Sequence, residues 1–241
     1  DAVSTMTLTI NGAATANAGP NATICEGSSY TLAGTSATNY TSYLWTTSGT
    51  GTFSNTTTTL TPVYTPSAAD VTAGTVTLTL NVTANAPCSN TSDAMVLTVT
   101  SSPEADAGSD ATICAGSTYT VNDATASNYA SLLWTENGTG SLTNATGLTP
   151  TYTPGVGETG IVTLTLTASP NTGCSTAAVS TMTITINGSA TANAGIDATI
   201  CETAGSYTLS GTATNYTSYM WTTSGTGTFS NTTTTLTPVY T

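Results

Sequence analysis

Cysteine is the residue type whose spacing points most directly to chemistry. Cys25, Cys114 and Cys201 lie 89 and 87 residues apart, and Cys88 and Cys174 follow the first two. The chain has no histidine and no Cys-x-x-Cys motif, so these positions indicate a disulfide framework rather than a zinc site. The simplest pairing lies within repeats, as Cys25–Cys88 and Cys114–Cys174, and leaves Cys201 for a partner beyond Thr241.

A second pairing stays open on geometric grounds. In an immunoglobulin-like sandwich, the loop before the second strand and the loop before the last strand lie at opposite ends. Cys25 belongs to the first kind of loop and Cys88 to the second, whereas a disulfide needs Cα atoms within about 7 Å. Bonds between neighbouring repeats, of the Cys25–Cys174 type, are therefore an alternative, with Cys88 pairing backward and Cys114 forward.

The cysteines belong to a sequence that repeats itself. Residues 39–65 recur at 215–241 with one change, and a diverged copy fills 128–153. Trp45, Trp134 and Trp221 keep the same spacing as the cysteines. A fixed period of this kind is the signature of an array. We predict that residues 1–12 are the last strand of a preceding repeat, that 13–103 and 104–190 are complete repeats, and that 191–241 are an incomplete one. We interpret the chain as a window from a longer array.

Alternating apolar and polar residues predict the elements that carry these side chains. Residues 75–83, TVTLTLNVT, place Val76, Leu78, Leu80 and Val82 on one face of a strand. Residues 1–12 are likewise predicted to form a strand with Met6, Leu8 and Ile10 on one face. About seven short strands in a repeat of about 88 residues are typical of an immunoglobulin-like sandwich. The predicted fold is therefore all-β, as a tandem, end-to-end array of immunoglobulin-like β-sandwiches.

The recurring aromatic residues are predicted to be core residues. A single Trp in the third strand of such a sandwich usually packs in its core. Trp45, Trp134 and Trp221 are therefore assigned to the core, with sugar stacking as the alternative. The same assignment applies to the recurring tyrosines, whose hydroxyls are expected to bond to the backbone: Tyr64, Tyr152 and Tyr240.

Other polar motifs give weaker signals. Asp106 and Asp110 could contribute to a calcium site, but Asx turns are favoured because the other repeats carry poorer ligands there. No metal site is predicted. Asn-x-Ser/Thr sequons are weak evidence of N-glycosylation in a chain so rich in Asn and Thr; they include Asn39, Asn55, Asn81, Asn137 and Asn215.

The charge inventory excludes several classes of function. The chain has no Lys, Arg or His, and its twelve acidic residues give a net charge of −12. Without these side chains only paired carboxylates could catalyse a reaction, and no acidic pair recurs in all three repeats. We therefore expect no enzyme activity, no catalytic residue and no cofactor. The missing cations also argue against nucleic-acid binding, and no apolar run is long enough for membrane insertion.

Four stretches carry a resemblance to a known family: AGPNATICEGSSYTLAGT, LWTTSGTGTFSN, TPVYTPSAADVTAG and TVTLTL. They resemble the PKD/Ig-like repeats of giant secreted Bacteroidetes surface proteins, of the gliding-motility adhesin and cell-surface filament type. The resemblance extends over essentially the whole chain. It implies a non-catalytic, extracellular, multi-module protein at the cell surface, and it supplies no shared ligand-binding residue.

These observations lead to three functional hypotheses. The first is the structural shaft of an extracellular filament or giant adhesin, whose partners are neighbouring repeats of the same or an identical chain. The second is a multivalent adhesive module that binds glycans or surfaces, where repetition supplies avidity. The third is a subunit that polymerises by strand exchange, because residues 1–12 read as a closing strand and residues 191–241 lack their last two strands.

Overall fold

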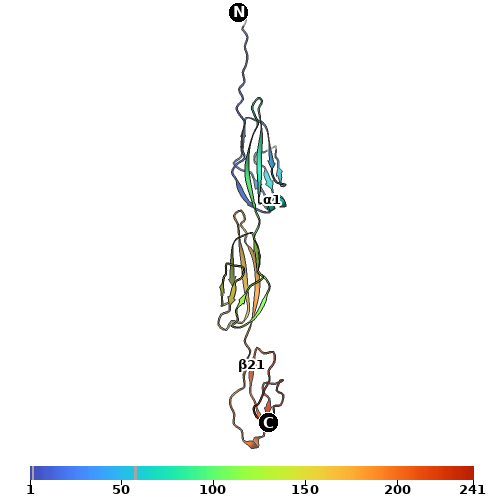
Figure 1. Ribbon diagram of the computed structural model, residues 1–241, viewed down its shortest axis with the longest axis vertical. Helices are drawn as coiled ribbons and strands as arrows, with labels where there is room; N and C mark the ends of the chain where they lie inside the picture. The colour runs from blue at the N-terminus through green and yellow to red at the C-terminus, as the bar shows by residue number, and fades with distance from the viewer. Residues whose placement is uncertain (2, 57–58) are drawn as a thin grey trace. The chain divides into compact units, whose positions relative to one another are not determined.

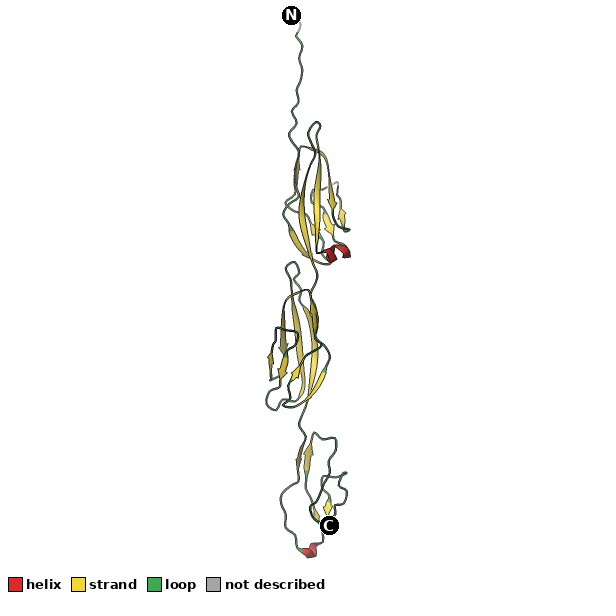
Figure 2. Ribbon diagram, in the orientation of Figure 1, coloured by secondary structure: helices red, strands yellow, loops and turns green. Residues whose placement is uncertain are grey.

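The computed structural model describes residues 1, 3–56 and 59–241. By the density of their contacts, these residues form two compact units. The first contains Asp1–Asp106, Thr125–Leu133 and Leu166–Ser180, and the second contains Ala107–Ala124, Trp134–Thr165 and Thr181–Thr241. Strands dominate the chain, as Figures 1 and 2 show.

The first sandwich is built by the strands between Thr15 and Thr100. Its larger sheet has the order β2-β9-β8-β5, with bounds Ala22–Cys25, Thr91–Thr100, Thr75–Ala84 and Tyr40–Thr47. Strand β2 runs parallel to β9, whereas β8 is antiparallel to both of its neighbours. The second strand of the sandwich, β2, therefore pairs with its last strand, β9.

A smaller sheet and a short strand pair complete the first sandwich. The sheet has the order β3-β7-β6, and β1 pairs with β4; the bounds are Tyr30–Thr31, Val63–Thr65, Thr52–Ser54, Thr15–Asn17 and Ser36–Thr38. Tyr64 lies in the centre of this sheet, opposite Tyr30 on one side and Phe53 on the other. This register directs the Tyr64 ring into the space between the two sheets.

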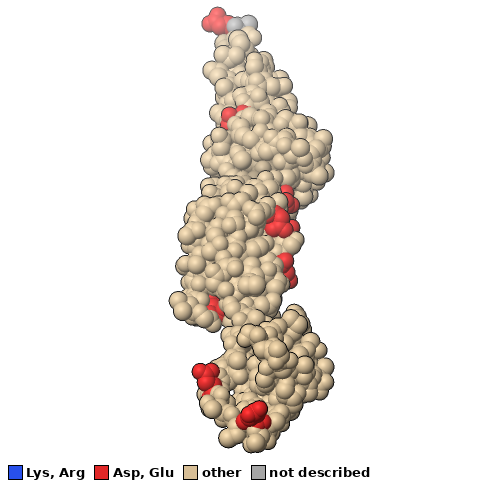
Figure 3. Space-filling model, turned by 60° about the horizontal axis from the view of Figure 1, so that its bottom comes forward, with Lys and Arg blue, Asp and Glu red and all other residues tan. Residues whose placement is uncertain are grey.

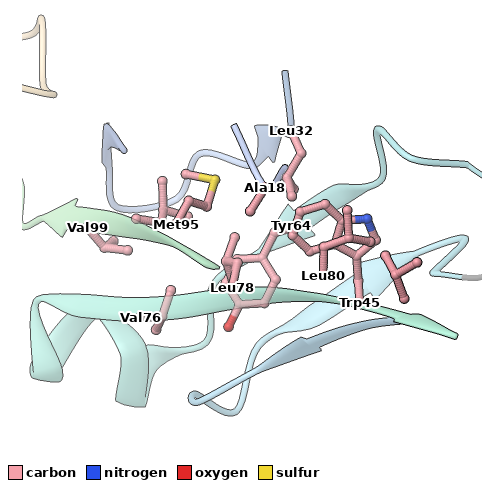
Figure 4. Close-up of a cluster of buried hydrophobic side chains, with 11 residues drawn as sticks. Ala18, Leu32, Trp45, Tyr64, Val76, Leu78, Leu80, Met95 and Val99 are labelled. Atoms are coloured by element: carbon pink, nitrogen blue, oxygen red, sulfur yellow. The ribbon is translucent and has the colours of Figure 1, made fainter. Parts of the chain in front are cut away.

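The core of the first sandwich follows the predicted alternation. Val76, Leu78, Leu80 and Val82 on β8 are all at most 2% exposed. They pack with residues from β5, from β9, from the smaller sheet and from the segments next to β1 and β3, most of which Figure 4 labels. These residues are Ala18, Leu32, Trp45, Tyr64, Met95, Leu97 and Val99. The prediction of one buried face on this strand is confirmed.

A short helix interrupts the strands before β8. Helix α1 (Ala68–Ala73) begins at a capping box, in which Ser67 and Asp70 bond to each other's backbone N–H groups. It ends at Gly74, whose φ of 74° lies in the left-handed region that glycine tolerates best. The predicted all-β fold contains no helix, so α1 is an addition to it.

The second sandwich repeats this plan. Its larger sheet has the order β11-β18-β17-β14, its smaller sheet the order β12-β16-β15, and β10 pairs with β13. The bounds, in that order, are Ala111–Cys114, Ala178–Asn187, Gly160–Pro170, Tyr129–Glu136, Tyr119–Thr120, Thr151–Thr153, Ser141–Thr143, Glu104–Asp106 and Thr125–Ser127. Strand β11 is again parallel to its neighbour β18. The all-β, immunoglobulin-like tandem fold predicted from the sequence is confirmed.

Residues 191–241 have much less regular structure. They contain β19 paired with β21, β20 paired with β22, and one short helical turn, η1; the bounds are Thr191–Asn193, Thr212–Thr214, Tyr207–Thr208, Val239–Tyr240 and Glu202–Ala204. No strand is assigned among the described residues of 1–12, and their assignment to a preceding repeat stays a prediction. An extended segment counts as a strand only when its backbone groups are paired.

Acidic side chains are sparse on the surface. On the face drawn in Figure 3 they form small, separate groups among uncharged residues. With no Lys or Arg in the chain, these carboxylates have no basic side chain to pair with. Backbone N–H groups donate to Asp93 and Asp110, and a hydroxyl donates to Glu104.

Candidate functional site

A disulfide joins Cys25 to Cys174, two residues separated by 149 positions in the sequence. Cys25 is the last residue of β2, and Cys174 lies in the connection between β17 and β18. Their Cα atoms are 4.6 Å apart, within the usual range for a disulfide. The Thr100 hydroxyl donates a hydrogen bond of 2.9 Å to the Thr172 carbonyl beside the bond. This is the pairing that the sequence analysis gives as the alternative.

The within-repeat pairs Cys25–Cys88 and Cys114–Cys174 are not the ones formed. Cys25 lies opposite Thr100, the last residue of β9, whereas Cys88 precedes Thr91, the first residue of that strand. A ten-residue strand is about 30 Å long, far beyond the reach of a disulfide. Cys114 likewise lies opposite Asn187, the last residue of β18, whereas Cys174 precedes Ala178, the first residue of that strand.

Cys88, Cys114 and Cys201 are free thiols among the described residues. The Cys88 sulfur lies 3.5 Å from the Asn11 carbonyl oxygen and 3.6 Å from that of Gly12. Cys114 and Cys201 are exposed. All five cysteines singled out by spacing are thus placed, two in a bond and three as thiols.

The two tryptophans of the complete sandwiches are core residues. Trp45 and Trp134 are each 2% exposed, and the Trp134 indole donates a 3.0 Å hydrogen bond to the Gly147 carbonyl. Trp221 is half-buried and packs against Phe229 at 6.0 Å between ring centroids. The indole faces of Trp45 and Trp134 are therefore not accessible to a sugar.

A buried carboxylate beside the core tyrosine is the feature that sequence reasoning missed. Asp70 is 2% exposed and accepts four hydrogen bonds at 2.8–3.0 Å, from the Tyr64 hydroxyl and from the backbone N–H groups of Thr50, Gly51 and Ser67. A side chain at Gly49 or Gly51 would collide with this carboxylate, which explains the glycine-rich turn. The network fixes the turn, the helix start and the smaller sheet to one another.

The second sandwich builds the same network with a different acid. Glu158 accepts hydrogen bonds from the Tyr152 hydroxyl at 2.7 Å, from Thr139 N–H at 2.6 Å and from Gly155 N–H at 2.8 Å. Gly140 N–H donates to the Tyr152 hydroxyl oxygen at 3.2 Å. The expected backbone bond is therefore present at the Tyr152 hydroxyl, while the hydroxyls of Tyr64 and Tyr152 both donate to a carboxylate, which was not expected. The Tyr240 hydroxyl instead accepts a bond of 3.3 Å from the Thr223 hydroxyl.

The networks change the pKa of the groups that form them. Burial alone raises the pKa of the Asp70 carboxyl, but its hydrogen bonds outweigh burial, so that its pKa lies below the usual value. The same balance lowers the pKa of Glu158. Burial, followed by the hydrogen bond to Glu158, raises the pKa of Tyr152 to about 12. The neutral tyrosine and the ionised acid are therefore the stable pair.

These directions predict acid sensitivity. A carboxyl whose pKa is lower in the folded than in the unfolded state contributes stability above its unfolded pKa of about 4. That contribution is lost as the pH falls through the folded pKa, so the free energy of unfolding should decrease below about pH 4. Urea unfolding at pH 7 and pH 3 measures this. A D70N/E158Q double variant should be less stable than the wild type at pH 7, and its free energy of unfolding should decrease less between pH 7 and pH 3. An equal decrease in the wild type and the variant would contradict the prediction.

Asp110, considered for calcium, and the asparagines aligned with Asp106 in the other repeats bond to backbone N–H groups. Asn17 and Asn193 accept hydrogen bonds from the N–H groups two residues later, at 2.9 and 2.8 Å, as in an Asx turn. Asp110 accepts a 2.7 Å bond from the N–H of Thr183, which ties β11 to β18. Within the described residues, no group of three or more Cys, Asp or Glu side chains could hold a metal ion.

Several sequon asparagines use their side-chain amides inside the fold. Asn39 donates to the Ala13 carbonyl at 2.8 Å, and Asn215 to the Ser189 carbonyl at 3.3 Å. Asn81 donates to Thr46 Oγ1 at 3.0 Å. All three asparagines are exposed, and a glycan would replace one of the two hydrogens on the amide nitrogen, so the bond in the fold would depend on the other hydrogen.

Comparisons with known proteins add similarity of fold only. No family model matches the chain, and no curated protein matches it. A titin fragment, domains I67–I69 with an E-to-A mutation, is 10% identical over 94% of this chain and 86% of that one, with a TM-score of 0.48. The N-terminal four Ig domains of Dscam1 isoform 6.9 are 14% identical over 72% of this chain and 46% of that one, with a TM-score of 0.42.

A third solved structure is of the cadherin type. Protocadherin Gamma B2 extracellular cadherin domains 3–6 are 14% identical over 72% of this chain and 51% of that one, with a TM-score of 0.45. The chain thus spans about half of the length of the Dscam1 and protocadherin fragments. None of the helices in the described residues is long and apolar enough to span a membrane.

Proposed function

We propose that this chain is the structural repeat region, or shaft, of an extracellular filament or giant cell-surface adhesin. The observation that carries the proposal is the Cys25–Cys174 disulfide, which links residues of the two predicted complete repeats, 13–103 and 104–190. A bond between repeats limits bending at their junction, which benefits a shaft and would be of no use to independent binding modules. The repeat boundaries from the sequence are part of this proposal.

The side-chain inventory supports a structural role. The aromatic faces that would serve a sugar-binding array are buried at Trp45 and Trp134. A chain without Lys or Arg also has no cleavage site for trypsin-like proteases, which suits prolonged exposure outside the cell. Placement at the cell surface, and the link to gliding motility, rest on the resemblance of the sequence to Bacteroidetes surface repeats and are proposed with the function.

Single-molecule pulling on the chain ends tests the shaft directly. The disulfide shields the residues between Cys25 and Cys174 from extension, because load passes across the bond. With 149 positions shielded and about 3.5 Å per extended residue, full unfolding of the oxidised chain should release roughly 500 Å less length than that of the reduced chain.

A Cys25→Ser variant is the matched control and should behave like the reduced chain under oxidising conditions. Equal release by the oxidised wild type and the variant would show that the bond between repeats does not form, and would remove the main support for the shaft. Chymotryptic peptide mapping without reductant would identify the partner of Cys25 in the same sample, since trypsin cannot cut the chain.

A further inference from the structure

Threonines cover much of the outer face of the larger sheet in the second sandwich. Strands β17 and β18 lie in the middle of this sheet, and their inward side chains, Leu164 and Ile184, are 0% exposed. Since side chains alternate along a strand, the residues next to them point outward. The second threonine face consists of seven outward threonines on the four strands: Thr112, Thr135, Thr163, Thr165, Thr181, Thr183 and Thr185.

The first sandwich carries a face of the same kind. Thr98 on β9 lies opposite Thr23 on β2 and Thr75 on β8, which gives a row of three threonines across three strands. Thr79 on β8 lies opposite Thr46 on β5. The first threonine face consists of Thr23, Thr46, Thr75, Thr77, Thr79 and Thr98. Both sandwiches therefore hold outward threonines in rows along and across their strands.

The strands set the spacing of these threonines. Outward residues recur at every second position, so they lie about 6.6 Å apart along a strand, and neighbouring strands are about 4.8 Å apart. The oxygen atoms on a prism face of ice also form a rectangular lattice, with repeats of similar size. Adjacent strands are rotated by about 20°, so the two lattices match best over two or three strands. Each face therefore offers a compact patch of matched positions.

The hydroxyls of the second threonine face are available to water. Thr163 and Thr183 donate hydrogen bonds to Asn137 and Asp110 through their backbone N–H groups. Within the described residues, none of the seven hydroxyls bonds to another side chain or to a carbonyl. A hydroxyl can donate one hydrogen bond and accept two, and the methyl group beside it is apolar. Water above this face is therefore held in positions that the sheet determines.

Both threonine faces are neutral. A charged side chain would order water in its own hydration shell and disturb a lattice of neutral water. The chain has no Lys or Arg, and Asp110, beside the second face, accepts a 2.7 Å bond from the N–H of Thr183. On β9, the positions opposite Thr77 and Thr79 are held by Val96 and Ala94, which are also uncharged. The faces are therefore surfaces of methyl and hydroxyl groups.

This chemistry favours ice over two other occupants. A second copy of the chain carries the same net charge of −12, so two copies repel each other and have no basic side chain to offset the repulsion. A glycan would be expected to stack on aromatic rings, whereas Trp45 and Trp134 are buried at 2% exposure. Ice is neutral and presents hydrogen-bond donors and acceptors in a fixed lattice, which a grid of hydroxyls can match.

We propose that the two threonine faces bind ice, and that the waters held by their hydroxyl and methyl groups become part of the ice lattice. The proposal adds a ligand to the proposed shaft and does not rest on that function. Each face is a site by itself, so a chain with both faces stays attached when one of them is released. An array of such sandwiches would attach to an ice surface through many weak contacts.

The test is the partition of the purified chain between slowly growing ice and the remaining solution. A solute that does not bind is pushed ahead of the ice front, whereas we expect this chain to become more concentrated in the ice than in the solution. Replacing the aligned Thr79 and Thr165 by tyrosine covers the centre of both faces with a ring. This double variant should lower the ratio of protein in ice to protein in solution about tenfold or more.

Thr31→Tyr combined with Thr153→Tyr is the matched control, because both residues are exposed on the smaller sheets. The control should enter ice like the wild type, and urea unfolding would verify that both double variants fold. Exclusion of the wild type from ice, or equal incorporation of the two double variants, would overturn the proposal. Binding to cellulose, or a dimer, that only the face variant loses would then assign the faces to a glycan or to a second copy. Pulling on single chains involves no ice, so failure here leaves the shaft proposal standing.

Discussion

Replacing Asp70 by alanine is expected to lower the free energy of unfolding of the first sandwich by about 4 kcal/mol. The carboxylate is 2% exposed, and its removal leaves three backbone N–H groups and the Tyr64 hydroxyl without their acceptor. Each buried donor without an acceptor costs about 1–3 kcal/mol, reduced where water enters the space. Asp70→Asn keeps one acceptor oxygen and should cost about half as much.

Urea unfolding combined with hydrogen exchange of peptic peptides would locate this loss. Exchange should accelerate in β8 and β9 of the first sandwich. The matched control is Asp93→Asn, because Asp93 is exposed and accepts a single bond of 2.8 Å, from Ala18 N–H, which asparagine can also accept. If Asp70→Ala proved no more costly than this control, the carboxylate would not hold the turn, helix and sheet together.

Trp134→Ala is expected to destabilise the second sandwich by about 4 kcal/mol, and Trp45→Ala the first by a similar amount. Both side chains are 2% exposed, so truncation leaves a cavity as well as removing buried apolar surface. Trp221→Ala should cost only about 1 kcal/mol, since that ring is half-buried. The stability losses of the three variants at these aligned positions can therefore be compared directly with one another.

Denaturation curves of the three variants, with a glycan array in parallel, would test this ordering. The alternative that these residues stack on sugars requires the opposite pattern, a loss of glycan binding with little loss of stability. If alanine at Trp45, Trp134 and Trp221 lowered the free energy of unfolding by similarly small amounts, these side chains would not be the core residues that their burial indicates.

The fold could be predicted because its signals are local and repeated. Alternation in residues 75–83 identifies β8, and the recurrence of Trp45 and Trp134 sets the register of the repeats. Helix α1 was not predicted because it is only six residues long and is flanked by Pro66 and Gly74, residue types that are typical of connections.

The carboxylate networks could not be predicted in the same way. Asp70 and Glu158 differ in residue type and lie in segments of different structure, so comparison of the repeats gave no common acid. Both acids follow their core tyrosine by six residues, the signal that could have revealed them. The cysteine pairing stayed open for another reason: spacing identifies positions along the chain, whereas a disulfide depends on which end of a strand each cysteine occupies.

The parallel pairing of β2 with β9 determines when each sandwich can form as the chain emerges. Cys25 lies opposite Thr100, so the first sheet stays open until its last strand has been made. Cys174, the partner of Cys25, is synthesised later than Thr100 and also later than Cys88. Correct pairing therefore requires that folding precede oxidation, because the finished sheet places Cys88 beyond the reach of Cys25. Exposure to an oxidant before folding would trap the nearer pair, Cys25 and Cys88, so the order of folding and oxidation becomes part of the assembly of this protein.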